Sequence, residues 1–185
     1  MLSRRSVLGL LTGLLVSCSS PNPTLYTLAV VPGSAHAGAP KLIELRSIAL
    51  ARYLERSQIV RSSEDFRLDV LSNEWWGEPL DAMLGRILVQ ELTDRLPGST
   101  VFAENSAIST NADIIIGINV QRLDADRSGT IILIAQIAMS GRNASARSIR
   151  LSVPPTVAGT SGLVSAMSTA PGQLADAAAE MLAGR

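Results

Sequence analysis

The chain has 185 residues, and its 16 basic and 16 acidic side chains leave a formal net charge of zero. Binding to nucleic acid requires clustered lysines and arginines, so this balance and the single lysine, Lys41, exclude that class of partner. Aromatic residues make up only 3% of the sequence, which also argues against stacking platforms for bases or sugars.

The first eighteen residues have the features of an export signal. Arg4 and Arg5 precede an apolar run, Val7 to Val16, of about ten residues, whereas a helix needs roughly 20 to cross a bilayer. We therefore predict that residues 1–17 are a signal peptide that is removed. Cys18 is the only cysteine, so its sulfur cannot form an intramolecular disulfide and needs another use.

Residues 15–18, Leu-Val-Ser-Cys, resemble the lipobox of bacterial lipoproteins. The resemblance implies cleavage between Ser17 and Cys18, with a diacylglycerol group and an N-acyl chain on Cys18. Each buried methylene contributes about 0.8 kcal/mol, so two or more acyl chains anchor a protein stably. Ser19 follows, which in similar lipoproteins predicts the periplasmic face of the outer membrane rather than the inner membrane. Residues 3–8 approach the twin-arginine pattern, so general secretion and twin-arginine export are both open.

Residues 18–24 are predicted to be an extended, lipidated tether, because Pro21 and Pro23 block regular structure. A single domain is expected at residues 25–185. In its first half, strands are expected at residues 25–31, 43–50, 58–61 and 66–71, with a loop at residues 32–40. The spacing of these strands predicts a meander.

Residues 79–96 predict the clearest helix of the chain. Its apolar residues recur at steps of three and four: Leu80, Met83, Leu84, Ile87, Leu88 and Leu92. These form one stripe, which we expect to pack on a sheet. Pro79 suits the first helical position, and Pro97-Gly98 supplies the stop.

The second half predicts strands at residues 100–103, 112–123, 130–141 and 147–153, then a helix within residues 162–183. The linker at residues 124–129 is polar and ends in glycine, so the two long strands should form a hairpin. One face of that hairpin is apolar and the other mixed, which is compatible with partial cover by a second layer or another subunit. Pro171 should kink or restart the last helix.

The order of these elements predicts the α+β class. We expect one two-layer domain with a mainly antiparallel sheet and two helices packed on one of its faces.

Three stretches of the chain resemble a known family. They are Tyr26-Thr27-Leu28, residues 53–61 (Tyr-Leu-Glu-Arg-Ser-Gln-Ile-Val-Arg) and residues 74–80 (Glu-Trp-Trp-Gly-Glu-Pro-Leu). In this order they are similar to the ABC-type transport auxiliary lipoproteins, which include the paraquat-inducible protein C group. The resemblance implies a partner subunit with a mammalian-cell-entry (MCE) domain, an ABC permease and an ATPase, and lipid transport between membranes. It also implies ring-like homo-oligomers.

Five residues in these stretches are candidates for a partner interface: Tyr53, Arg56, Arg61, Trp75 and Trp76. Trp, Tyr and Arg are enriched among binding hot spots. The alternative is structural. One tryptophan would then pack in the core, the other would cover the helix start, and the tyrosine and arginines would be strand-end packing and solvated charges.

Catalysis has little support in this sequence. His36 is the only histidine and lies in a loop of small residues, so neither a Ser-His pair nor a histidine metal site is expected. The pairs Asp65 with Asp69 and Asp124 with Asp126 are better explained by solvation at turns and strand edges than by acid-base chemistry. We therefore expect a non-enzyme without cofactor or metal.

The family resemblance, together with the acylation pattern, implies a lipid-anchored periplasmic accessory subunit that docks on an MCE-type transporter and tethers or aligns it at the outer membrane. Two alternatives are an envelope lipoprotein that assists assembly of outer-membrane proteins and a periplasmic lipid-binding carrier.

Overall fold

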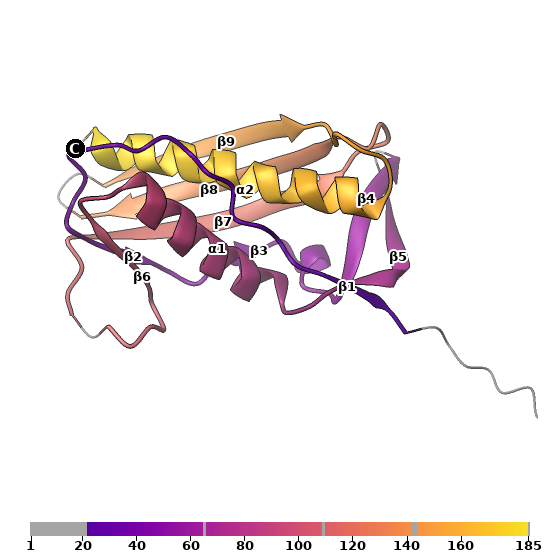
Figure 1. Ribbon diagram of the computed structural model, residues 1–185, viewed down its shortest axis with the longest axis horizontal. Helices are drawn as coiled ribbons and strands as arrows, with labels where there is room; N and C mark the ends of the chain where they lie inside the picture. The colour runs from indigo at the N-terminus through magenta and orange to yellow at the C-terminus, as the bar shows by residue number, and fades with distance from the viewer. Residues whose placement is uncertain (1–21, 65, 109, 142–143, 185) are drawn as a thin grey trace, which may run out of the picture.

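A computed structural model describes residues 22–64, 66–108, 110–141 and 144–184. The predicted signal peptide, Ser17 and Cys18 lie outside these residues. The described chain forms one mixed sheet covered on one face by two helices, α1 (Leu80–Arg95) and α2 (Thr160–Ala183) (Figure 1). The strands are β1 (Thr24–Tyr26), β2 (Leu42–Leu45), β3 (Ala49–Leu50), β4 (Gln58–Glu64), β5 (Arg67–Trp76), β6 (Thr100–Ala103), β7 (Ile114–Ala125), β8 (Ile131–Ser140) and β9 (Ser145–Val153). The predicted α+β class is confirmed.

Strand β7 organises the sheet. Along one edge it pairs with β8 over its whole length, from Ile115 opposite Ser140 to Ala125 opposite Ile131, and β8 pairs in turn with β9. Both ladders are antiparallel, as predicted for the hairpin. At its turn, Asp126 accepts the backbone N–H groups of Ser128 and Thr130, and Gly129 adopts a φ of 86° that other residues avoid.

The neighbours of β7 along its other edge show that the predicted meander is wrong. It pairs in succession with β2, β3 and β4, and all three ladders are parallel. Strand β2 lies between β7 and β6, so β2 and β4 are not neighbours. The chain instead follows β7 through β3 and the short 3-10 helix η1 (Arg52–Leu54), because the two-residue strand β3 continues along β7 rather than turning back.

The core lies between the helices and the sheet. The predicted stripe of α1 is buried from Leu80 to Leu92, and so are the alternating residues of β7 and β8, such as Ile116 and Leu133. On the opposite face Ile132 is buried, Ile115 and Ile134 are half-buried, and Asn119 and Gln136 are exposed.

Helix α2 is continuous through Pro171, so the helix does not restart there. Within the described ranges, no helix combines the length and apolar character needed to span a bilayer.

Residues 27–40, here called the strap, replace most of the strand predicted at residues 25–31. The strand ends at Tyr26, and the strap then crosses both helices (Figure 1). Three of its backbone N–H groups donate to helix side chains: Leu28 to Met83 Sδ (3.0 Å), Ala29 to Ser168 Oγ (3.0 Å) and Val31 to Glu91 Oε1 (2.9 Å). Side-chain acceptors on α1 and α2 therefore replace a neighbouring strand.

Strands β4 and β5 form an antiparallel hairpin, here called the β4–β5 arm, beside the main sheet. Its register with β7 is a single residue pair, Arg61 opposite Ala125. Apolar side chains on one face of the arm are exposed: Phe66 (90%), Leu68 (46%) and Val70 (41%). The arm therefore leaves much of its apolar surface outside the core.

Candidate functional site

The second and third family-like stretches meet in space. Residues 53–61 end η1 and begin β4, while residues 74–80 end β5 and begin α1. The backbone N–H of Trp76 donates to the carbonyl of Ser57 (2.7 Å), and Gln58 is paired with Trp75. The β4–β5 hairpin thus brings these two motifs together as the walls of one cleft.

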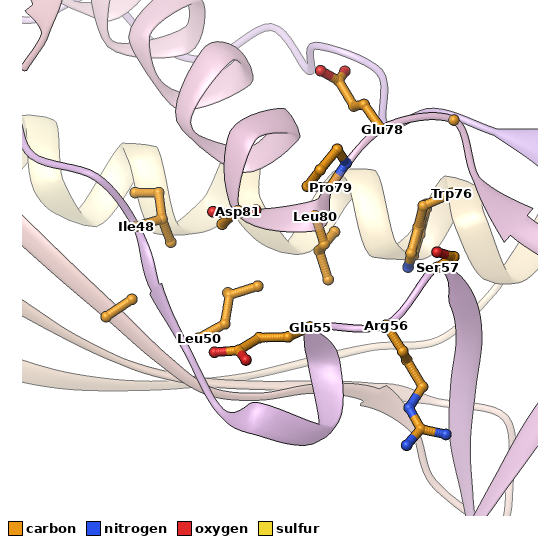
Figure 2. Close-up of a pocket in the computed structure, with 12 residues that line it drawn as sticks. Ile48, Leu50, Glu55, Arg56, Ser57, Trp76, Glu78, Pro79, Leu80 and Asp81 are labelled. Atoms are coloured by element: carbon orange, nitrogen blue, oxygen red, sulfur yellow. The ribbon is translucent and has the colours of Figure 1, made fainter. Parts of the chain in front are cut away.

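This cleft has a volume of about 670 Å³ and lies between β3, η1 and the start of α1 (Figure 2). Ile48, Leu50, Trp76 and Leu80 supply its apolar lining. Its charged residues are Glu55, Arg56, Glu78 and Asp81. In Figure 2, Glu55 extends toward Leu50, whereas Arg56 extends away from the other lining residues. An apolar floor with charged groups at its edge is typical of binding surfaces rather than of reaction centres.

A second cavity of about 730 Å³ continues along the exposed flank of α1 toward residues 101–108. It shares Ile48, Glu78 and Asp81 with the first, and we call the two together the α1 groove. Arg86 forms an ion pair with Glu78 across its rim. At the far end, the backbone N–H and the hydroxyl of Ser47 both donate to Glu104, which lowers the pKa of that carboxyl.

Of the five candidate interface residues, the structure brings Arg56 and Trp76 to the groove. Trp76 is 6% exposed and packs in the core as well. Trp75 is half-buried, and its indole N–H donates to the carbonyl of Ser72 (3.0 Å). Arg61 lies on the arm, with its Nε 3.9 Å from an Asp69 carboxylate oxygen. The arginines and tryptophans therefore do not form a single patch.

Tyr53 does not line the groove, and its hydroxyl belongs to a polar network around Asp124. Its hydroxyl donates to Asp124 at 2.6 Å, and Asp124 also accepts bonds from Ser62 and Arg122. Burial, followed by the bond to this carboxylate, raises the pKa of Tyr53 far above its ordinary value. The network joins η1 and the β4–β5 arm to β7.

The prediction that Asp124 and Asp126 are both solvated at a turn is wrong for Asp124. Asp126 lies at the turn, as predicted, but Asp124 is only 1% exposed. Its burial depends on Tyr53 and Ser62, which are 71 and 62 residues away in the sequence. Asp65 lies outside the described residues, and Asp69 pairs with Arg67 on the arm. No local pattern around residue 124 signals that network.

Sequence reasoning also missed Arg95, a fully buried arginine in the last turn of α1. Its Nη1 donates to the carbonyl of Val31 in the strap (3.2 Å), its Nη2 to the carbonyl of Gly172 in α2 (3.1 Å), and its Nε to Asp176 (2.6 Å). A Cβ atom at Gly33 would lie 2.2 Å from Arg95 Cζ, so a side chain there would displace the Arg95 guanidinium from its hydrogen bonds. Arg95 therefore joins the strap to both helices.

Glu91, one helical turn before Arg95, is also fully buried. Its Oε1 accepts the N–H of Val31, whereas its Oε2 has no hydrogen-bond partner within the described part of the chain. Burial raises the pKa of Glu91 to about 7. The strap is therefore held by a carboxyl group that titrates near neutral pH.

Among the described residues, no group of three or more His, Cys, Asp or Glu side chains could hold a metal ion. His36 lies in the strap, where its backbone N–H donates to the carbonyl of Arg95 (2.7 Å). What this arrangement offers chemically is a binding groove and a firmly attached N-terminal segment.

Comparisons with known proteins agree with this picture. The sequence profile of the ABC-type transport auxiliary lipoprotein component family matches residues 26–179. Intermembrane transport lipoprotein PqiC of Escherichia coli (strain K12) is 30% identical over 95 residues, which cover 49% of this chain and 51% of that protein. The chain thus matches about half the length of this relative, and PqiC of Shigella flexneri gives the same values.

Two solved structures share the fold. A crystal structure described as that of an uncharacterized protein has a TM-score of 0.75 at 18% identity and covers 87% of this chain and 99% of its own. A protein from Xanthomonas campestris has a TM-score of 0.72 at 17% identity and covers 86% of this chain and 94% of its own. At such identities the likeness shows the fold alone.

Proposed function

The chain belongs to the ABC-type transport auxiliary lipoprotein family, and from this premise we propose that it is the lipid-anchored periplasmic accessory subunit of an MCE-type ABC lipid transport system. In this role it tethers or aligns the transporter at the outer membrane. The family match over residues 26–179 carries the proposal, and the Leu-Val-Ser-Cys motif directly before the domain supports it.

The strap supports a mechanical role. A tether transmits position only if its folded end does not pull away, and this strap is tied to α1 and α2 through Glu91, Arg95 and Ser168. An anchor on Cys18 would therefore keep the whole helix layer within reach of the membrane. This role requires binding and placement, with no chemical step.

The α1 groove is the proposed docking site for the transporter. Its lining includes both family-like stretches, with Trp76 and Leu80 as apolar contacts and Arg56 at the edge. The half-buried apolar residues on the helix-free face of β7 and β8 are the proposed contact between copies in a ring. Both contacts would use preformed surfaces.

The deciding experiment is capture of partners by the acylated protein from membranes of cells that express the full chain. We expect the MCE-domain subunit with its permease and ATPase. Cys18→Ala should abolish processing and membrane attachment. Recovery of only outer-membrane porins would contradict the transporter role, and copurification of phospholipid without these subunits would favour a lipid carrier.

Charge reversal sharpens the test of the groove. Arg56→Glu should reduce recovery of the MCE-domain subunit, because Arg56 lies at the edge of the groove. Arg52→Glu is the matched control, since Arg52 is an exposed arginine of η1 that does not line the groove. Equal loss in both variants would mean that general charge, and not the groove, governs capture.

A further inference from the structure

Large apolar side chains that remain exposed gather at one end of the molecule. Within the described residues there are seven of them: Leu25, Val30, Phe66, Leu68, Val70, Ile108 and Val157. Five of the seven belong to β1, the β4–β5 arm and the connection from β9 to α2, which leaves Val30 and Ile108 elsewhere. The most exposed are Phe66 (90%), Leu25 (63%) and Val157 (59%).

The sheet register places the tip of the arm and the end of β9 at the same end of the sheet, and β1 pairs with the base of the arm, where Leu25 lies opposite Trp75. Ala125, at the end of β7, is paired with both Arg61 in the arm and Ile131 in β8, and Ile131 is paired with Val153 at the end of β9. Phe66 and Arg127 line one cavity of about 510 Å³, so the tip of the arm lies beside the β7–β8 turn. In Figure 1 this end is on the right, where β1 also leads out of the domain. We call it the apolar end.

The length of the tether determines which end of the domain lies near the membrane. Thr24, the first residue of β1, is six residues after Cys18, and six extended residues span about 20 Å. The opposite end of the sheet is much farther from the anchor, because the twelve residues of β7 span about 40 Å. A lipid on Cys18 therefore confines the apolar end, and not the opposite end, to the neighbourhood of the bilayer.

We propose that the apolar end rests on the phospholipid surface, with Phe66, Leu25 and Val157 inserted at the boundary between headgroups and acyl chains. The inference depends on the proposed acylation of Cys18. A few apolar side chains bind a membrane weakly by themselves, but the anchor keeps them at high effective concentration beside it. Arg127 and Arg150, which line the cavity next to Phe66, are placed to meet lipid phosphates. This contact fixes the orientation of the domain, and the groove then faces a defined direction.

The only cysteine of the chain makes a clean test available. In the acylated protein the sulfur of Cys18 is blocked, so Phe66→Cys introduces the single free thiol, which is labelled with an environment-sensitive fluorophore. The labelled protein is incorporated through its own anchor into vesicles of phosphatidylethanolamine and phosphatidylglycerol. Asn105→Cys is the matched control, because Asn105 is equally a solvent-exposed loop position but follows β6 at the opposite end.

We expect blue-shifted emission from the label at position 66 and several-fold stronger quenching by nitroxide-labelled phospholipid than at position 105. Equal, weak quenching at both positions would overturn the proposal. A blue shift that persists in detergent and is not quenched by nitroxide lipid would mean that a second copy covers Phe66, which also overturns it. Failure of the protein to float with the vesicles would instead show that Cys18 does not anchor it, which would contradict both the proposed acylation and this inference.

Discussion

The sheet beneath the helices and the β4–β5 arm at its edge use the same alternating sequence pattern in different ways. On the helix-covered face, alternate residues of β7 and β8 are buried, as Leu133 is. The β4–β5 arm is joined to the edge of β7 through one residue pair and one polar network, and at its tip Phe66 is 90% exposed. Alternation thus selects the face of a strand, but a partner layer decides whether that face becomes core.

The largest expected effect tests whether only the helix-covered side carries stability. Leu133→Ala should lower the free energy of unfolding by about 4 kcal/mol, because it leaves a cavity in a close-packed layer. Gln136→Ala, on the exposed side of the same strand, should change it by about 0.5 kcal/mol or less. Urea denaturation followed by circular dichroism measures both. Similar losses in the two variants would show that the exposed side is also packed.

The next effect concerns the buried carboxyl on the helix-covered side. The pKa of Glu91 is raised by burial from 4.5 to about 7, so the folded state binds the proton more tightly than the unfolded state. Stability from this group is therefore full below pH 4.5, falls as pH rises to about 7 and stays lower above it, by about 3 kcal/mol in total.

Glu91→Gln should remove this pH dependence, because an uncharged amide still accepts the Val31 N–H. Urea denaturation across the pH range measures it. Asp126→Asn is the opposite control: the hydroxyl of Ser128 lowers the pKa of Asp126, so its contribution is present at neutral pH and is lost as pH falls. A wild-type protein whose stability does not decline between pH 4.5 and 7 would contradict the account of Glu91.

A smaller effect is expected at the junction between the arm and the sheet. Tyr53→Phe removes a hydrogen bond to the buried carboxylate of Asp124 and should cost about 2 kcal/mol. Amide hydrogen exchange should accelerate first in β4, because Ser62 shares that carboxylate. Tyr26→Phe, at the only other tyrosine, should leave exchange in β4 unchanged. Faster exchange throughout the sheet would mean that the arm is not a separate unit.

The smallest effect is expected at the tip of the arm. Phe66→Ser should change the free energy of unfolding by about 0.5 kcal/mol or less, because the ring is almost fully exposed and leaves no cavity. Thermal and urea denaturation of the protein in detergent are sufficient to measure this. A loss comparable to that of Leu133→Ala would show that Phe66 is covered in solution, and the arm would then no longer differ from the helix-covered sheet.

Some candidate residues were accessible to sequence reasoning and others were not. The motifs around Arg56 and Trp76 stand out in the sequence, but their meeting in one groove depends on the pairing of β4 with β5. Arg95 and Asp124 give no local signal, since a charged residue at the end of a helix or strand is ordinarily solvated. Their burial follows from segments that are remote in the sequence, namely the strap and η1.

The sequence by itself determined the helical stripe of α1, the alternation of β7 and β8, the hairpin between them and the export and acylation pattern that predicts an anchor at Cys18. These are local properties, set by periodicity and by turn and stop residues within a few positions. Tertiary structure decided that β7 takes three parallel neighbours along one edge, that residues 27–31 leave the sheet to cross the helices, and that Asp124 is buried. Periodicity says which way a side chain points but not which segment meets it, because strand pairing and helix crossings are chosen by the packing of the whole chain.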